Sequence, residues 1–304
     1  MDTVLYLIVF IVILLIYMHV IKHYELSFER SIDTIEFSKE QIKECCKKKQ
    51  VVIFDNIMEI VIFDNILEND SDIWKGSHDF YLKSSEEHFL QYPLYMKYTI
   101  VENLMQNSSK YFSENNHSVA HEILSDSCMD KELRPELCVN TIYDILLGSQ
   151  NTRTFFNYHK HHSMFLFVQS GKIRLYIKYS NNKNIAKCES NYYDMTYGSV
   201  NKLSYDQQVL INENQVCFIP PFLLYQIEYI ENTTIMSYSY NDLGSFVSQI
   251  PDIGLYYIHR FSHSQKKSIN TKRNVVIEES DVGIEKESKD VNENLEVIEK
   301  NDEM

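Results

Sequence analysis

Glycine is scarce in this sequence, with only seven in 304 residues. Loops that wrap phosphate groups need several closely spaced glycines, because a backbone amide approaches a ligand most closely where no side chain intervenes. Phosphate-binding loops of this kind are therefore excluded. No Ser-His-Asp order or paired-carboxylate pattern stands out either, so the familiar hydrolase motifs find no support.

Cysteine pairs with metal-binding spacing are also missing. The six cysteines are scattered, and no C-x-x-C or C-x-x-H pair occurs, which argues against a zinc site. A domain large enough to have its own core does not need a disulfide framework. We therefore expect reduced thiols at all six positions, which are Cys45, Cys46, Cys128, Cys138, Cys188 and Cys217.

The chain is acidic, with a formal net charge of -14. Between Ile277 and Met304, eleven acidic residues face three lysines, so this stretch alone contributes -8. A segment with no aromatic and few apolar residues buries too little surface to offset its ordering entropy, so we expect residues 265–304 to form a disordered acidic tail. No basic stripe interleaved with aromatics occurs, so nucleic-acid binding is not expected.

One long apolar run is present near the N-terminus, from Val4 to Ile21. It just reaches the length that a helix needs to cross the hydrocarbon core of a bilayer. A cleaved signal peptide would have a basic start and small residues at its end, and a buried core helix would be amphipathic. We therefore predict an uncleaved transmembrane helix over residues 4–21. Basic residues follow the run, beginning with Lys22 and Arg30, so the body is predicted to be cytosolic.

Beyond the anchor, the sequence predicts a neck over residues 22–50 and one domain over 51–264. Ser38 is a plausible N-cap for a short helix that ends near Lys48. A near-perfect tandem copy follows, VIFDNIME (52–59) and VIFDNILE (61–68). Two copies do not make a solenoid, and duplication of a strand explains them better.

Strand patterns are clearest in two later regions. Met164 to Val168 is apolar, Gln169 to Lys172 is a turn, and apolar residues then alternate from Ile173 to Ile177, which predicts a hairpin with one buried face. A second strand system runs from Gln215 to Tyr240, with breaks at a proline pair and at a turn near residue 232. Two such systems about fifty residues apart predict a mainly β fold, an antiparallel jelly-roll barrel.

These two regions resemble the cupin-like and JmjC-type oxygenases. In that family an H-x-D motif precedes an apolar strand that ends in S-G-x-K-R, and here the apolar run is followed by Ser170-Gly171-Lys172. The family also has an IP-P-x-W-W-H-x-V strand, and the segment FIPPFLLYQIEYI (218–230) is similar to it. The layout as a whole, over roughly residues 4–274, resembles the cupin-like membrane proteins of giant DNA viruses. The resemblance implies a double-stranded β-helix with short flanking helices and a viral origin.

The enzymes of this superfamily hold Fe(II) through two histidines and one carboxylate, with open positions for 2-oxoglutarate and dioxygen. Aligned from Ser170-Gly171, the H-x-D positions fall on Tyr158 and Lys160, or after a one-residue shift on His159 and His161. Neither placement supplies a carboxylate, and the distal histidine position is Tyr225. The ligand positions are thus degenerate, and we predict no catalytic residues.

Two features leave alternatives open. His159 and His161 share a strand face and could bind a transition metal with a third ligand, or could be rim residues of a decayed metal site. Lys172 and Arg174 lie where the family places the basic partner of the 2-oxoglutarate carboxylate, so they form either an anion pocket or a solvent-facing edge.

Two main functions follow from these observations. The first is a membrane-anchored, non-catalytic cupin-like protein with a structural or protein-interaction role and no cofactor, located in a host or virion membrane if it is viral. This protein would contact the lipid bilayer through residues 4–21. The sequence does not specify its protein partner or its oligomeric state. The alternative is a hydroxylase that depends on Fe(II) and 2-oxoglutarate with atypical ligands. A weaker third reading is a carbohydrate or lipid-headgroup binder that uses an aromatic barrel mouth.

Overall fold

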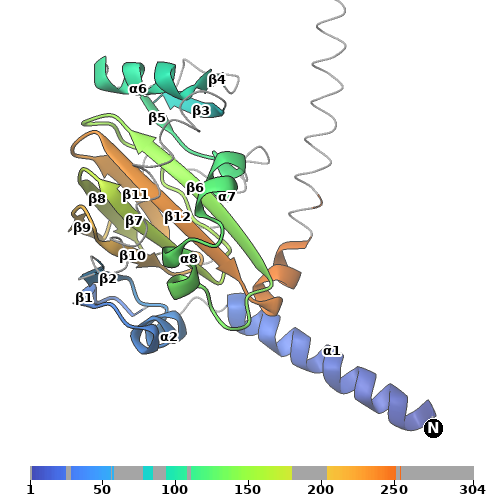
Figure 1. Cartoon of the computed structure of the whole chain (residues 1–304). Coiled ribbons are helices and arrows are strands. Elements are labelled where there is room, and N and C mark those ends of the chain that lie inside the picture. Colours follow the sequence, from blue (N-terminus) through green and yellow to red (C-terminus); the bar gives the residue numbers. More distant parts are fainter. Residues whose placement is uncertain are drawn as a thin grey trace, which may run out of the picture. The chain divides into compact units, whose positions relative to one another are not determined.

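The computed structural model describes residues 2–24, 29–55, 57, 78–84, 94–107, 111–179, 204–250 and 254. The chain divides into two units, 1–252 and 253–304, and every helix and strand named below belongs to the first. Figure 1 labels these elements along the chain. The second copy of the tandem repeat, Cys188 and the predicted tail over 265–304 lie outside the described residues.

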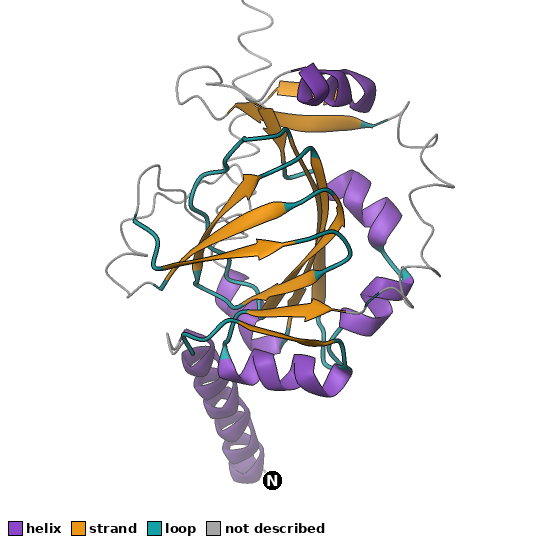
Figure 2. Cartoon of the chain, turned by 90° about the vertical axis from the view of Figure 1, so that its left-hand side faces the viewer, coloured by secondary structure: helices purple, strands orange, loops and turns teal. Residues whose placement is uncertain are grey.

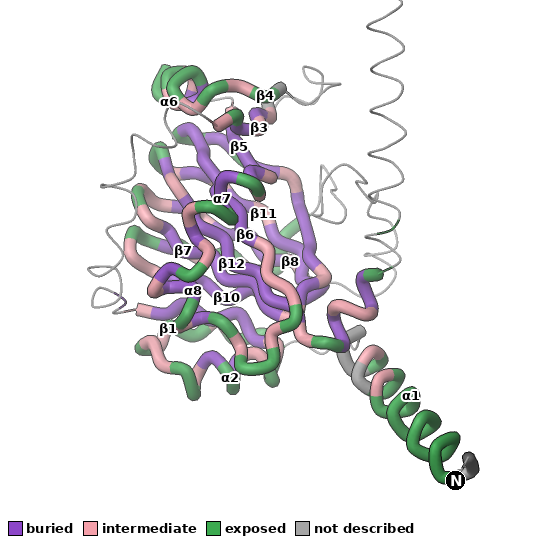
Figure 3. The backbone as a smooth tube through the Cα atoms, turned by 45° about the vertical axis from the view of Figure 1, so that its right-hand side comes forward, coloured by how far each residue is buried: buried purple, intermediate pink, exposed green. Residues whose placement is uncertain are grey.

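Helix α1 (Asp2–Tyr24) covers the long apolar run, so the predicted helix is confirmed. Most residues of this helix are exposed (Figure 3). Tyr6, for example, is 73% exposed. Among the described residues, no helix combines the length and the apolarity that crossing a membrane requires. A membrane-spanning role for residues 4–21 stays a prediction.

Helix α2 (Lys39–Lys48) is the predicted neck helix. The hydroxyl of Ser38 accepts a hydrogen bond from the backbone N–H of Gln41 at 3.3 Å, which satisfies a donor that the helix leaves unpaired. The helix ends at Lys49, which has a left-handed backbone with φ 51°, a common way to terminate a helix. Local sequence signals alone therefore define this element.

Most strands form one nine-stranded sheet in the order β1-β2-β10-β7-β12-β6-β5-β3-β4. Neighbours are antiparallel throughout, except that β1 and β2 run parallel. The strands are β1 (Asp33–Glu36), β2 (Val52–Asp55), β3 (Asp79–Ser84), β4 (Leu94–Lys97), β5 (Tyr111–Ser113), β6 (Asn140–Gly148), β7 (Ser163–Ser170), β10 (Val216–Ile219) and β12 (Thr233–Asn241).

A second, three-stranded sheet has the antiparallel order β11-β8-β9. It consists of β8 (Ile173–Lys178), β9 (Gln207–Ile211) and β11 (Leu224–Tyr229), and isolated bridges from Arg153 and Asn157 continue it beyond β11. Figure 2 shows the strands of the two sheets facing each other.

The path of the chain identifies the fold. From β6 onward it visits the larger sheet at β6, β7, β10 and β12, and the smaller sheet at 153–157, β8, β9 and β11. Repeated crossing between two antiparallel sheets is the topology of a jelly roll. The mainly β, jelly-roll prediction is therefore confirmed.

The predicted hairpin between Met164 and Ile177 is wrong in its pairing. Both strands form, as β7 and β8, but β7 pairs with β10 and β12 whereas β8 pairs with β9 and β11. Gly171, with φ 82°, turns the chain from one sheet to the other. Alternating apolar residues show which face of a strand is buried, but they do not show its partner.

Three short helices accompany the larger sheet: α6 (Tyr98–Asn107), α7 (His117–Leu124) and α8 (Cys128–Leu133). Tyr95 to Thr99 can be read as a strand from the sequence, but this segment is divided between the end of β4 and the start of α6. On α8, the fully buried Asp130 forms an ion pair with Arg134 and accepts hydrogen bonds from Tyr143 and Tyr240, each at 2.9 Å. This carboxylate links α8 to both β6 and β12.

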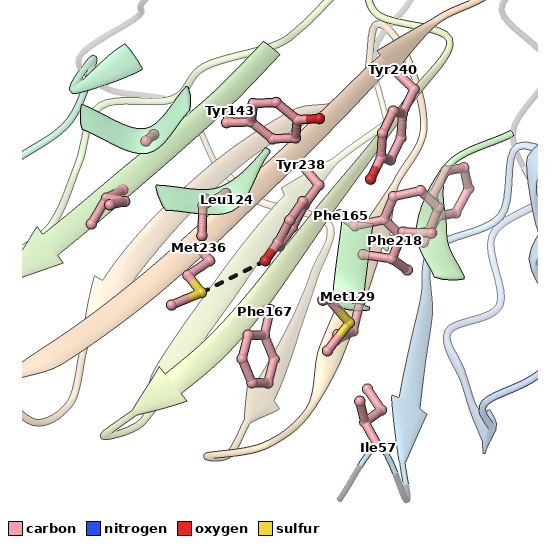
Figure 4. Close-up of a cluster of buried hydrophobic side chains, with 14 of the residues drawn as sticks. Ile57, Leu124, Met129, Tyr143, Phe165, Phe167, Phe218, Met236, Tyr238 and Tyr240 are labelled. Atoms are coloured by element: carbon pink, nitrogen blue, oxygen red, sulfur yellow. Dashed lines mark hydrogen bonds between the residues drawn. The ribbon is translucent and has the colours of Figure 1, made fainter. Parts of the chain in front are cut away.

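Two apolar cores lie on opposite faces of the larger sheet. The outer core packs aromatic side chains of the sheet, including Tyr143, Phe165 and Tyr238, against α2, α7 and α8. Figure 4 shows these rings with Leu124 and Met129 from the helices. The helices thereby cover the face of the sheet that points away from the barrel interior.

The inner core fills much of the space between the two sheets. Aliphatic side chains dominate it, such as Val168, Ile173, Leu175 and Ile235, all of which are fully buried. The five cysteines among the described residues are free thiols, as predicted for them, and burial raises the pKa of Cys217 to about 12. Among the described residues, a group of polar side chains interrupts this apolar filling and forms the candidate site.

Candidate functional site

The polar end of the barrel interior encloses a cavity of about 40 Å³. Ten of its lining residues carry polar side chains, although such groups are expensive to bury unless they are hydrogen-bonded. They are Glu114, His117, Asp144, Thr154, Asn157, His159, His161, Tyr225, Ser237 and Ser239. This concentration of polar groups marks the cavity as the candidate functional site.

His159 and His161 lie in the segment that leads into β7, and both line the cavity. Their side chains are buried, with residue exposures of 1% and 5%, and their rings stack with centroids 5.7 Å apart and 15° between planes. Nε2 of His159 lies 3.0 Å from the carbonyl oxygen of Ile219. That contact requires a proton on Nε2, because a carbonyl only accepts.

The tautomer of His161 is set by an amide chain. The side-chain amide of Gln249 donates to Oδ1 of Asn241 at 2.8 Å, so Nδ2 of Asn241 is directed at Nδ1 of His161, 3.3 Å away. An amide nitrogen only donates, so Nδ1 of His161 accepts in this arrangement. Both histidines therefore each use one ring nitrogen in a hydrogen bond to the protein.

Tyr225, which the sequence alignment places at the distal histidine position, lines the cavity from β11. It is buried, and its hydroxyl lies 3.8 Å from Sδ of Met164. Burial raises the pKa of the Tyr225 phenol far above its ordinary value, with smaller contributions from Glu114 and Asp144. A phenol in this environment stays neutral and is a poor metal ligand.

Tyr158 and Lys160, the other two candidate positions of the motif, do not face the cavity. Tyr158 is buried but stacks on Phe222, with ring centroids 6.5 Å apart, and Lys160 is partly exposed. Neither lines the cavity. His162 lies 3.3 Å from a carboxylate oxygen of Asp242. Of the two possible alignments, the one-residue shift to His159 and His161 is the one that faces inward.

Lys172 and Arg174 are also remote from the cavity lining. On β8 the fully buried residues are Ile173, Leu175 and Ile177, so Arg174 lies on the opposite face of the strand. There its guanidinium contacts Glu228 at 2.8 Å. Neither basic residue supplies positive charge to the interior.

Two buried carboxylates are cavity residues that the sequence reasoning missed. Glu114 pairs with Lys83 at 2.7 Å, and Asp144 accepts the backbone N–H groups of Asn115 and Asn116 at 2.8 and 2.7 Å. Burial raises the pKa of Asp144, with these hydrogen bonds and His117 opposing the shift. A signal was available, because Asp144 is an acidic residue inside the apolar strand β6.

The cavity does not fit iron and 2-oxoglutarate. Fe(II) in these enzymes needs two histidines and a carboxylate on one face, and the described residues contain no group of three or more His, Cys, Asp or Glu placed to hold a metal ion. A volume of about 40 Å³ also admits only a few water molecules. Pockets for organic ligands usually span roughly 300–1,000 Å³.

No family model matches the sequence, and no curated protein is recognisably similar to it. Among solved structures, the chain is similar to Escherichia coli YcfD, a ribosomal oxygenase, in complex with cobalt and 2-oxoglutarate, with 11% identity and a TM-score of 0.47 over 72% of this chain and 56% of that one. Another structure of E. coli ycfD has 10% identity and a TM-score of 0.44, over 61% and 48%. The chain thus spans about half the length of these proteins, and these values are too low to assign chemistry to the cavity.

Proposed function

We propose that this chain is a non-catalytic, cupin-like protein with a structural or protein-interaction role. The observation that carries the proposal is the state of the interior where the superfamily's enzymes bind iron. Its histidines and carboxylates do not form a group of three placed to hold a metal ion among the described residues, and the buried Tyr225 stands where the sequence alignment places the distal histidine. The remaining space is too small for an organic co-substrate.

The rest of the interior supports the same function. Aliphatic side chains from β7, β8 and β12 fill the barrel, and the stacked Tyr158 and Phe222 rings are buried near the segment that holds His159. A filled barrel is a rigid body that presents its outer surface to a partner. Its working surface would then be outside the barrel rather than within it.

The protein's association with a bilayer through α1 is part of this proposal. Fifteen large apolar side chains of this helix are exposed, and burying them in lipid would remove a large apolar area from water. Lys22 and Arg30 follow the apolar run, which favours a cytosolic body. The viral origin implied by the sequence resemblance belongs to the same proposal.

Metal content tests the main function. The full-length chain would be purified anaerobically in a nonionic detergent, supplied with Fe(II), and compared with His159→Ala and Tyr225→His. We expect iron far below one equivalent and no turnover of 2-oxoglutarate in the parent. Stoichiometric iron that His159→Ala abolishes would refute the non-catalytic function.

That refuting result would support a second candidate, a hydroxylase that depends on Fe(II) and 2-oxoglutarate. One observation favours it: three imidazoles and two carboxylates line the same cavity. His159 and His161 would be its metal ligands, and the cavity would have to enlarge on binding the co-substrate. Turnover of 2-oxoglutarate that depends on an added protein or small-molecule substrate is the result that it requires.

Bilayer association needs its own test. Vesicle flotation of the full-length chain would be compared with a variant that carries Ile11→Lys and Leu14→Lys. Each lysine near the centre of a spanning helix costs about 3 kcal/mol, so we expect the parent to float and the variant to remain at the bottom. Equal behaviour of the two proteins would refute the anchor.

A further inference from the structure

A second, larger pocket lies outside the barrel interior. Its volume is about 480 Å³, and its walls come from α2, from residues 132–136 after and within α8, and from the barrel residues His162, Pro221 and Asp242. No residue lines both this pocket and the cavity inside the barrel. Its volume falls in the range of pockets for small organic ligands, roughly 300–1,000 Å³.

One wall is a single face of α2. Lys39, Lys43 and Lys47 are four residues apart, and Ile42 and Cys46 alternate with them at the same spacing. Residues three and four apart lie above one another on a helix, so ammonium groups and apolar side chains form two adjacent stripes. This wall therefore offers positive charge beside an apolar surface.

The facing wall carries carboxylates that already occupy two of these ammonium groups. Glu132 contacts Lys39 at 3.2 Å, and Glu136 contacts Lys43 at 2.6 Å. All four side chains are more than a third exposed, and Glu136 is 80% exposed. Exposed ion pairs contribute little net stability, so an incoming anion can displace these carboxylates at small cost.

The floor of the pocket is apolar and firmly held. Ile42 and Leu133 are 6% and 1% exposed and belong to the outer core. Pro135 and Pro221 add further apolar surface. An apolar group of a ligand would therefore contact the core, while its charged group stays at the lysine wall.

The charge of the lining is opposite to that of the whole protein. Four lysines line the pocket against three acidic residues, and the fifth basic residue of the lining, Arg134, is paired with Asp130 and Asp126, although the chain carries a formal net charge of -14. A local excess of positive charge on an acidic protein concentrates anions at that place. The lining is thus suited to an anionic ligand.

We propose that this pocket binds an organic phosphate with an apolar body, either a soluble phosphate ester or the headgroup region of an anionic lipid. A phosphate monoester carries close to two negative charges, so it competes better than another carboxylate for lysines that Glu132 and Glu136 already contact. Lysine binds phosphate as a compact point charge. The apolar body of such a ligand would contact the apolar floor of the pocket, whereas a free inorganic anion would not.

Calorimetric titration of the full-length chain in a nonionic detergent tests this site, with phenyl phosphate as the probe. We expect phenyl phosphate to bind roughly tenfold more tightly than inorganic phosphate, because only the ester uses the apolar floor. Benzoate should also bind more weakly than phenyl phosphate. Dioctanoyl phosphatidic acid in the same detergent distinguishes the sources: tighter binding than phenyl phosphate indicates a lipid, and weaker binding indicates a soluble ester.

Variants of α2 provide the matched controls. Lys43→Glu combined with Lys47→Glu should weaken phenyl phosphate binding about tenfold or more. Lys48→Glu should change it less than about twofold, because Lys48 lies outside the lining and pairs with Glu44 at 2.8 Å on the same helix. Glu136→Gln should strengthen binding, because it removes the competing carboxylate.

Three results would overturn the proposal. Equal affinities for inorganic phosphate and phenyl phosphate would exclude any contribution from the floor. A loss of affinity in Lys48→Glu as large as in the double variant would reduce the effect to general surface charge. No measurable heat or displacement with phenyl phosphate at millimolar concentration, from a chain whose circular dichroism is native, would exclude the site.

Discussion

The imidazole rings of His159 and His161 stack nearly parallel inside the barrel, 15° between planes and 5.7 Å between centroids. Each ring has a hydrogen-bond partner in the protein, the carbonyl of Ile219 for His159 and the side-chain amide of Asn241 for His161. In this arrangement the pair connects the segment before β7 to the ends of β10 and β12. The histidines thus contribute to the fold independently of any metal.

Replacing His159 tests that structural role. His159→Ala removes a buried ring and leaves the Ile219 carbonyl without its donor, so we expect the free energy of unfolding to fall by about 2–3 kcal/mol. Urea denaturation measures this change. A metal ligand would add a second effect, because a bound ion stabilises the native state. Co(II) that stabilises the parent but not the variant would contradict a purely structural role.

Tyr229→Phe should stabilise the protein. Tyr229 is fully buried, and its hydroxyl has no hydrogen-bond partner among the described residues. Burial raises the pKa of Tyr229 well above its ordinary value, so the phenol is neutral. Removing an unsatisfied hydroxyl should raise the free energy of unfolding by about 1 kcal/mol. Thermal unfolding would show an increased midpoint.

The matched control for that prediction is Tyr176→Phe. The Tyr176 hydroxyl donates to Oε2 of Glu228 at 2.8 Å, so the same chemical change at this position should lower the free energy of unfolding. A decrease in both variants would mean that the Tyr229 hydroxyl has a partner that stabilises the fold.

Phe222 allows a comparison of backbone strain. It has φ 62°, a conformation that L-residues adopt at a cost, and its N–H donates to the carbonyl of His159 at 2.8 Å. Phe222→Ala and Phe222→Gly both lose the ring that stacks on Tyr158, but only Gly removes the Cβ. We expect the Gly variant to be more stable than the Ala variant by about 1 kcal/mol in urea denaturation. A Phe222→Ala variant more stable than Phe222→Gly would contradict backbone strain at residue 222.

Glu228 makes stability depend on pH. Burial opposes its ionisation, but the Tyr176 hydrogen bond and the charges of Arg153 and Arg174 outweigh it, so the pKa of Glu228 is lowered. A lowered carboxyl pKa stabilises the fold at neutral pH, and this stability is lost as the pH falls through the folded-state pKa. Glu228→Gln should therefore lower the free energy of unfolding near pH 7. We expect a decrease of only about 1 kcal/mol, because the arginines are partly exposed to solvent.

Chemical denaturation from pH 7 to pH 3 measures this dependence. The difference between parent and Glu228→Gln should shrink below the ordinary Glu pKa of about 4.3. A difference that stays constant over this range would show that Glu228 contributes by packing and not through its charge.

Local signals in the sequence were sufficient for several elements. The N-cap Ser38 and the apolar run from Val4 predicted α2 and α1, because capping and helix length depend on neighbouring residues. A continuous apolar run predicted β7, and alternating apolar residues predicted β8. Each of these depends on a short stretch of chain.

The candidate site was predicted only in part. The sequence identified two candidate pairs, His159 with His161 and Tyr158 with Lys160. It could not show which pair faces the interior, because residues 158–162 do not form a regular strand. Glu114 was missed, since its place in the cavity depends on β5 pairing with β6, a contact between strands separated by a helix pair.

By itself the sequence determined α1, α2 and the strands β7 and β8, together with the apolar face of β8, because these follow from residues close to each other in the chain. Only the tertiary structure decided that β7 and β8 belong to different sheets, that Arg174 faces away from the interior, and that α2 meets residues 132–136 in a basic pocket. Those relationships arise from the burial of two separate cores. They depend on segments far apart in the chain, whose pairing no local pattern specifies.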